Sequence, residues 1–365
     1  MKYNVSEPDI SDKEINYVCD AVKSTWVSSK GKYIDEFEEK FKNYIGTKCG
    51  LTASNGTTAL HLALSALNIK KGDEVIVPDL TFISPVNAVL YNNATPVLCD
   101  IKKDSWCIDE NKIESLINEK TKAIIVVHLY GNSADMDKIM EIKRKYNLYL
   151  IEDTAESLGT KYKGRKLGSF GDIGCFSFYG NKTMTTGEGG FCTTDDEDLY
   201  NKMLILRDHG MTSKKRYWHE FIGYNYRMTN LQAALGLAQI ERLDYFISRK
   251  RDIARIYHEN LKDYVVTHPE GNNYNGTYWL YSILLNDEKR RDGLVDYLSR
   301  YGIETRRFFY PVHVMPPYIK YSKDDYKVSD EISQKGMNLP SGVKLNKDDI
   351  DYISDKIIEF LKYSQ

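Results

Sequence analysis

The sequence predicts an α/β protein in which helices flank a large, mostly parallel mixed sheet, followed by a smaller α+β domain. Apolar, β-rich runs alternate with amphipathic helical patterns through the first two-thirds of the chain, and this alternation stops near residue 240. Parallel strands need long crossover connections, usually helices, so such alternation is typical of βαβ units. A chain of 365 residues is long enough for two domains, and we expect them at 1–240 and 241–365.

The elements of the first domain are predicted in chain order. A helix should follow the polar loop at Asn55, because Leu60, Ala63, Leu64 and Leu67 recur at helical spacing. Short apolar runs beyond it indicate buried strands. We expect a strand at 74–78, a helix at 86–91, strands at 96–101 and 123–129, a helix at 135–146 and a strand at 148–153.

The segment 168–190 interrupts this pattern with seven glycines around a strand-like run at 175–179. Glycine at this density costs backbone entropy, so it indicates a close approach of the backbone to another group. After residue 240 we expect a long polar helix, a strand and two further helices. These should lie at 248–264, 278–285, 294–301 and 347–363.

Charge and cysteine usage exclude several classes of function. Fifty Lys and Arg against 52 Asp and Glu leave a net charge of -2, which gives no general attraction to nucleic acid or acidic membranes. The sequence shows neither a spanning apolar segment nor a signal-peptide pattern, so we expect a cytoplasmic protein. The six cysteines lack metal-ligand spacing, so we expect reduced thiols in the core and no metal site.

Three short motifs could carry chemistry. The first is the stretch 54–60 (SNGTTAL), a small polar loop that opens into a helix. Free N–H groups and the partial positive charge at a helix N-terminus can bind phosphate, with Gly56 and Thr57 at the entry. The alternative is that Ser54 or Asn55 only caps the helix.

The second motif, 151–156 (IEDTAE), places acids at the end of an apolar strand. Ligands of open α/β sheets bind at that edge, although Asp153 could also cap the next helix. The third, 176–183 (FSFYGNKT), holds Lys182 among aromatic residues and glycines, with 187–190 (GEGG) following. A desolvated lysine can act as a nucleophile, whereas an ordinary loop lysine is a solvated surface charge.

The order of the three motifs matches the needs of pyridoxal phosphate chemistry: a phosphate site, an acid for the pyridinium nitrogen and a Schiff-base amine. Over about residues 29–317 the chain resembles the DegT/DnrJ/EryC1/StrS aminotransferases, a branch of the fold-type I pyridoxal phosphate enzymes. Within that family it is most similar to members that aminate a GDP-linked 4-keto-6-deoxy sugar. The resemblance is carried by 24–31 (STWVSSKG), 128–131 (HLYG), 178–183 (FYGNKT), 185–190 (TTGEGG), 217–219 (YWH) and 223–230 (GYNYRMTN).

The resemblance implies roles for single residues in the cofactor site. Lys182 would form the Schiff base with pyridoxal 5'-phosphate and shuttle the proton, and Asp153 would keep the ring nitrogen protonated. Phe82 would stack on the ring, unless it only packs in the core. Glu156 stands where many relatives carry Gln near the 3-oxygen, and a carboxylate there would repel the phenolate unless it were protonated.

The remaining roles concern phosphate, partner and substrate. By resemblance, Gly56, Thr57 and Ser177 would hold the cofactor phosphate together with Asn225 of a second subunit, so the active unit would be a homodimer with shared sites. L-Glutamate would donate the amino group. Four further residues are candidate contacts of the sugar or its diphosphate, and each could instead be structural or solvated: His313, His219, Arg227 and Lys30.

Three alternatives stay open. The same chemistry could act on a UDP- or dTDP-linked keto sugar, or on a small keto phosphate such as dihydroxyacetone phosphate. A regulatory or ligand-binding protein could keep the fold without catalysis. A nicotinamide-dependent dehydrogenase is disfavoured, because neither G-x-G-x-x-G after a predicted strand nor a G-x-x-x-x-G-K-[ST] loop occurs in the sequence.

Overall fold

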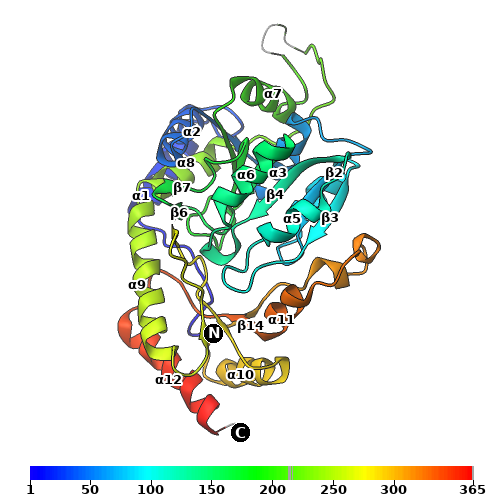
Figure 1. Ribbon diagram of the computed structural model, residues 1–365. Helices are drawn as coiled ribbons and strands as arrows, with labels where there is room; N and C mark the ends of the chain where they lie inside the picture. The colour runs from blue at the N-terminus through cyan, green and yellow to red at the C-terminus, as the bar shows by residue number, and fades with distance from the viewer. Residues whose placement is uncertain (213–214, 216, 364–365) are drawn as a thin grey trace.

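A computed structural model describes residues 1–212, 215 and 217–363, and its centre is a seven-stranded sheet (Figure 1). The sheet has the order β1-β9-β8-β5-β4-β2-β3; its last five strands are parallel, and β9 runs antiparallel to both neighbours. The mostly parallel mixed sheet is therefore confirmed. Its strands are β1 (Cys49–Ala53), β2 (Glu74–Pro78), β3 (Thr95–Cys99), β4 (Thr121–Val127), β5 (Tyr149–Asp153), β8 (Ile173–Ser177) and β9 (Gly190–Thr194).

Helices cover both faces of this sheet because its strands are apolar on both faces. One face packs against α3 (Gly56–Ala66), α4 (Ser84–Tyr91) and α7 (Glu197–Arg207). The opposite face packs against α5 (Glu110–Leu116) and α6 (Met136–Tyr146). A phenylalanine-rich cluster fills the β8–β9 side, under α1 (Asp12–Lys23), α2 (Lys32–Ile45) and α8 (Asn230–Ile240).

The C-terminal part forms a second, antiparallel sheet in the order β10-β12-β14-β13. The long helix α9 (Leu243–Leu261) leads down to it from the large sheet (Figure 1). Its core also includes α10 (Glu288–Arg300) and α12 (Lys347–Tyr363), while α11 (Lys327–Lys335) lies near β3. Its strands are β10 (Val266–Thr267), β12 (Ser282–Leu284), β13 (Arg306–Arg307) and β14 (Gly336–Asn338).

Two connections tie the parts of the chain together. The N-terminus lies beside β14 (Figure 1), where Tyr3 bridges Ile303 and both Lys2 and Tyr3 donate backbone hydrogen bonds to the Gly302 carbonyl. A small sheet of β6 (Lys161–Tyr162), β7 (Arg165–Lys166) and β11 (Tyr274–Asn275) joins segments from both halves. The two halves are thus held by strand pairing as well as by α9.

Several predicted boundaries are correct. The strand at 74–78 and the helix at 347–363 are confirmed at both ends. The helices expected at 86–91 and 135–146 appear as α4 and α6, and Asn55 does cap α3 through the Thr58 N–H. The strands expected at 96–101, 123–129 and 148–153 exist as β3, β4 and β5, but their bounds differ from the predicted ones by one or two residues at one or both ends.

Other boundaries were wrong. The strand expected at 278–285 shortens to β12, since Tyr278 has a φ of 49° that a strand does not accept. The strand expected at 175–179 is β8 at Ile173–Ser177. The helix expected at 248–264 begins at Leu243, and the one at 294–301 begins at Glu288 after its cap Asp287. The prediction that all cysteines lie in the core was also wrong for two of them, since Cys19 is exposed and Cys49 is half-buried.

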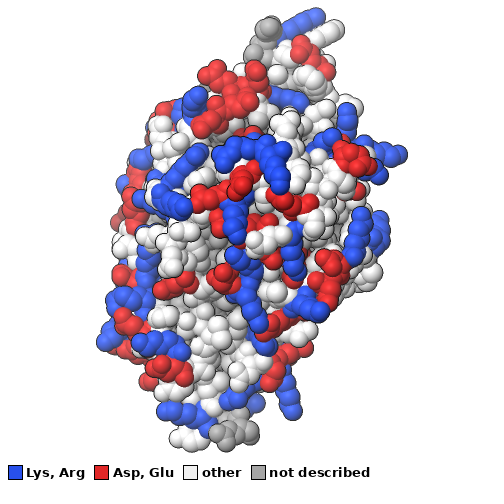
Figure 2. Space-filling model, in the orientation of Figure 1, with Lys and Arg blue, Asp and Glu red and all other residues white. Residues whose placement is uncertain are grey.

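The surface carries mixed charge. Basic and acidic side chains are interspersed over the face in Figure 2. Within the described residues, no helix is long and apolar enough to cross a membrane. The same residues contain no group of three or more His, Cys, Asp and Glu that could hold a metal ion.

Candidate active site

The site lies at the edge of the large sheet where its parallel strands end. Asp153 is the last residue of β5, Asp79 follows β2, and Ser177 ends β8. Carboxyl ends of parallel strands meet at one edge, which is where open α/β sheets bind ligands. The sheet therefore gathers acids and hydroxyls that lie far apart in sequence.

Asp153 is a buried acid with an unusual protonation equilibrium. Its side chain is almost fully enclosed, and burial raises the pKa of its carboxyl to about 6. A hydrogen bond of 3.0 Å from the Ala155 N–H to Oδ1 lowers this pKa, as does the charge of Lys182, while Glu156 raises it. The carboxyl is thus suited to a cationic N–H partner at the strand end.

Lys182 follows β8 on the glycine-rich segment and is not a solvated surface lysine. Its side chain is 12% exposed, and its Nζ lies 3.3 Å from Glu156 Oε1. The same Nζ lies 3.6 Å from the ring centroid of Trp279. Burial raises the pKa of Glu156, against the opposing effects of Lys182 and of the Tyr130 N–H, which donates to Oε2.

A phosphate-sized cradle lies at the N-terminus of α3. Asn55 caps the helix through the Thr58 N–H, which leaves the first N–H groups of the helix for a ligand. A Cβ on Gly56 would lie 2.8 Å from the Cβ of Ser177, so only glycine permits this approach. The hydroxyl of Thr57 lies 2.7 Å from that of Ser84. This donor set fits a phosphate.

Phe82 lies on the loop after β2 and is 54% exposed, so it does not pack in the core. Its ring centroid is 5.8 Å from that of Phe309, which in turn stacks on Tyr130 at 5.6 Å. Tyr130 stacks on Trp279 at 6.2 Å. An aromatic wall defined by Phe82, Phe309, Tyr130 and Trp279 thus runs from this loop to Lys182.

Three predicted residues lie together on the segment between α7 and α8, which projects from the top of the molecule in Figure 1. Asn225 is exposed, and its Oδ1 accepts hydrogen bonds from Arg227 Nε and Nη2. Arg227 also pairs with Asp208 at 2.7 Å. His219 is exposed beside the His209 carbonyl. A fourth predicted residue, Lys30, is exposed just before α2.

His313 lies between two carboxylates. Its Nδ1 lies 2.8 Å from Asp79 Oδ2, its Nε2 lies 3.5 Å from Asp330 Oδ1, and its ring stacks on Tyr326. Burial raises the pKa of Asp79, and the hydrogen bonds from His313 oppose this. Each ring nitrogen of His313 therefore already lies near a carboxylate of this chain. A substrate contact through His313 stays a prediction.

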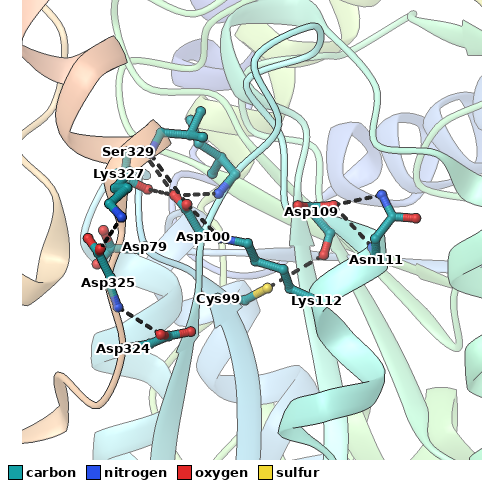
Figure 3. A network of polar contacts seen from close by, with 12 residues as sticks. Asp79, Cys99, Asp100, Asp109, Asn111, Lys112, Asp324, Asp325, Lys327 and Ser329 are labelled. Carbon is teal, nitrogen blue, oxygen red and sulfur yellow. Dashed lines mark hydrogen bonds and ion pairs between the residues drawn. The ribbon is translucent and has the colours of Figure 1, made fainter.

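A second strand-end acid anchors the segment that carries His313. Asp100, after β3, accepts hydrogen bonds of 2.9 Å from both the N–H and the hydroxyl of Ser329, and from Lys112 Nζ (Figure 3). Burial alone would raise the pKa of Asp100, but these donors hold it below its usual value. Asp100 thus fixes the first turn of α11 to the edge of the large sheet.

Trp279 has no predictive signal in its local sequence, and the sequence marks Tyr130 only as part of the stretch 128–131, without a role of its own. Tyr130 takes a φ of 54° and directs its N–H at Glu156. Trp279 comes from the lead-in to β12, almost one hundred residues beyond Lys182, so only the fold brings the two together. A motif search around Lys182 could not have found either residue.

Comparison with known proteins identifies the family of this chain. The model of the DegT/DnrJ/EryC1/StrS aminotransferase family matches residues 8–358. The chain is 49% identical to GDP-perosamine synthase of Escherichia coli O157:H7, over 99% of each chain, and 45% identical to that of Caulobacter vibrioides, over 96% of each. The structure of a putative sugar aminotransferase, Spr1654 from Streptococcus pneumoniae in its PLP-form, superposes with a TM-score of 0.93 at 29% identity, covering 99% of this chain and 98% of that one. The chain belongs to the DegT/DnrJ/EryC1/StrS aminotransferase family.

Proposed function

We propose that this pyridoxal phosphate-dependent aminotransferase moves an amino group from L-glutamate to the keto carbon of a nucleotide-linked 4-keto-6-deoxy sugar, with GDP as the nucleotide. The name GDP-perosamine synthase, carried by relatives that match over nearly the full length, supports this acceptor. The observation that supports aminotransferase chemistry is the cluster of the buried side chains of Lys182, Asp153 and Glu156, together with the phosphate site at the N-terminus of α3.

The residues present fit the cofactor. When bound, pyridoxal phosphate supplies an electron sink for the carbon that carries the amino group. The α3 N-terminus with Gly56, Thr57 and Ser177 would hold its phosphate, and Phe82 is exposed enough to stack on its ring. Asp153 would face the ring nitrogen, because an ionised carboxylate at this buried position stabilises an N–H cation.

Lys182 would carry the cofactor covalently and then move the proton. Its Nζ is enclosed beside Glu156 and Trp279, so water has little access to the reacting amine. Once displaced by the incoming amine, Lys182 would move the proton from the amino-bearing carbon of glutamate to C4′ of the cofactor. In the second half of the reaction it would move a proton from C4′ to the sugar carbon that receives the amino group. Burial raises the pKa of Glu156, and this would weaken the repulsion between its carboxyl and the 3-oxygen.

The substrate and the partner subunit would complete the site. Asn225, exposed on the segment between α7 and α8 and paired with Asp208, would contact the cofactor phosphate of the second subunit in a homodimer. Arg227, Lys30 and His219 are exposed or partly exposed basic groups that could meet the acceptor's diphosphate. All six cysteines are free thiols, which is consistent with a reducing, cytoplasmic compartment.

The acceptor is tested with a panel of keto compounds. The protein is incubated with L-glutamate and GDP-, UDP- or dTDP-linked 4-keto-6-deoxy sugars, or with dihydroxyacetone phosphate. 2-Oxoglutarate and the aminated product are then measured. We expect kcat/KM to be about tenfold or more higher for the GDP-linked sugar. A higher value for another acceptor would correct the nucleotide or the sugar, and a cofactor colour that glutamate does not bleach would favour a non-catalytic protein.

The shared site is tested by mixing two inactive variants, Lys182→Ala and Asn225→Ala. If Asn225 completes the site of the other subunit, a mixed dimer has one intact site, and random mixing restores about a quarter of wild-type turnover. Subunits are exchanged by dilution and reconcentration, and turnover is followed with time. A mixture as inactive as its components would show that Asn225 serves its own subunit.

A further inference from the structure

We propose that Trp279 is a positioning residue for Lys182: its indole face holds the Lys182 ammonium, together with Glu156, whenever that amine is not bonded to the cofactor. This inference rests on the proposed role of Lys182 in catalysis. It assigns a function to a residue that lies just before β12, in the C-terminal part of the chain. The position of the reactive amine then depends on how the two halves of the chain pack.

The contact between the two side chains has the geometry of a cation–π interaction. Nζ of Lys182 lies 3.6 Å from the ring centroid of Trp279, well inside the range of about 6 Å in which such pairs attract. Trp279 is 4% exposed, and the Lys182 side chain is 12% exposed. Cation–π attraction strengthens where water is excluded, and tryptophan is its best ring.

Hydrogen bonds hold both the indole ring and the backbone of Trp279. Its Nε1–H donates a hydrogen bond of 2.7 Å to the carbonyl of Asn181, the residue before Lys182. Its own backbone carbonyl accepts a hydrogen bond of 2.9 Å from Lys250 Nζ, which also donates to the Ser341 carbonyl. A ring held in this way can fix a flexible lysine, whose four-carbon side chain otherwise samples many rotamers.

Glu156 and Trp279 share one support. The Tyr130 ring stacks on Trp279 at 6.2 Å with an interplanar angle of 24°. The Tyr130 backbone N–H donates to Glu156 Oε2, while Glu156 Oε1 faces Lys182 Nζ at 3.3 Å. Trp279 and Glu156 both contact Tyr130, so their positions are fixed together. We call these two side chains the seat of the freed amine, because they form a preorganised binding site for it.

The seat has a consequence for the reaction cycle. In the half of the cycle in which Lys182 is free, an unconstrained amine would enter the space that the substrate occupies or leave the reacting carbon. The Trp279 face keeps the amine beside the reaction centre. Loss of the face should therefore expose a more reactive and less well-placed amine.

The test measures the reactivity of Lys182 directly. Full-length protein is treated with trinitrobenzenesulfonate at fixed pH, both stripped of cofactor and loaded with cofactor and then exposed to L-glutamate, and modification of Lys182 is followed by peptide mass spectrometry. Exposed lysines of the same chain serve as internal standards. In Trp279→Leu we expect Lys182 to react about fivefold faster than in the wild type, because the indole no longer covers and holds its amine.

Two matched variants separate the ring from the hydrogen bond. Trp279→Phe keeps an aromatic face but loses the Nε1–H, so its rate should stay near the wild-type rate. Ser6→Ala removes the other hydrogen bond to the Asn181 carbonyl, which Ser6 Oγ makes at 3.0 Å, and should also leave the rate unchanged. Equal rates in Trp279→Leu and the wild type, equal rates in the Leu and Phe variants, or a fivefold rise in Ser6→Ala would each overturn the proposal.

A substitution-free measurement covers the case in which Trp279→Leu does not fold. Fluorination of the indole weakens the negative face of the ring and keeps its shape and its N–H. In protein made with mono- and difluorotryptophan, the Lys182 rate should rise stepwise with fluorine content. A rate independent of fluorination would overturn the proposal. The cofactor-free arm stays valid even if Lys182 does not carry the cofactor, so the two ideas can fail separately.

Discussion

Lys182→Ala should lose about a thousandfold or more in turnover with L-glutamate and any keto acceptor, because general acid–base transfer by one placed group contributes about 10²- to 10⁴-fold. The variant should still bind pyridoxal phosphate through the α3 cradle, but without a covalent link. Mass spectrometry after borohydride reduction measures that link, and equilibrium dialysis measures the cofactor that remains. Turnover near the wild-type value would contradict the assignment.

Two controls separate loss of the amine from damage to the fold. Lys122 is an exposed lysine on β4, so Lys122→Ala removes the same side-chain atoms away from the site and should keep full activity. A small primary amine such as ethylamine, added to Lys182→Ala, should restore part of the turnover, because it can enter the space left by the side chain and carry the proton. A misfolded variant would not respond to added amine.

Asp153→Asn should have two opposite effects. Turnover should fall by about a hundredfold to a thousandfold, since an amide cannot stabilise the charged ring nitrogen. The cofactor-free protein should become more stable at pH 7, by about 2 to 3 kcal/mol, because the wild-type carboxyl must ionise inside the protein, where burial has raised its pKa from 3.8 to about 6. Denaturant unfolding and steady-state turnover measure the two effects.

The sign of the pH dependence follows from the raised pKa. The folded protein holds the Asp153 proton up to about pH 6, whereas the unfolded chain releases it near pH 4. The contribution of this group to the free energy of unfolding is therefore complete below pH 4 and is lost as the pH rises through 6. The stability advantage of Asp153→Asn should grow over that interval. An advantage that does not change between pH 4 and 7 would contradict the burial argument.

The sequence predicts well those elements whose signal is local. The strand at 74–78 is a short apolar run with a clear start and end, and the helix at 347–363 has one continuous amphipathic pattern. The fold class follows because βαβ alternation repeats along the chain. The helix α8 is buried over most of its surface, so it lacks an amphipathic pattern and is not recognisable by periodicity.

The candidate site was predictable only in part. Lys182, Asp153 and Gly56 each sit in a motif that the chemistry explains, and the fold does bring Lys182 and Asp153 within electrostatic reach of each other. Trp279 contacts Lys182, and His313 contacts Asp79, only because the chain folds. No sequence spacing predicts either contact. The division of the chain at residue 240 stays a prediction.

The pairing of Tyr3 with Ile303 bears on how the chain is made. Tyr3 pairs with a residue that is synthesised three hundred positions later. The large sheet can form while the chain is still growing, but the N-terminal segment must wait for Gly302 and Ile303 before its hydrogen bonds are made. A chain that ends before Gly302 therefore leaves the backbone groups of Lys2 and Tyr3 without these partners.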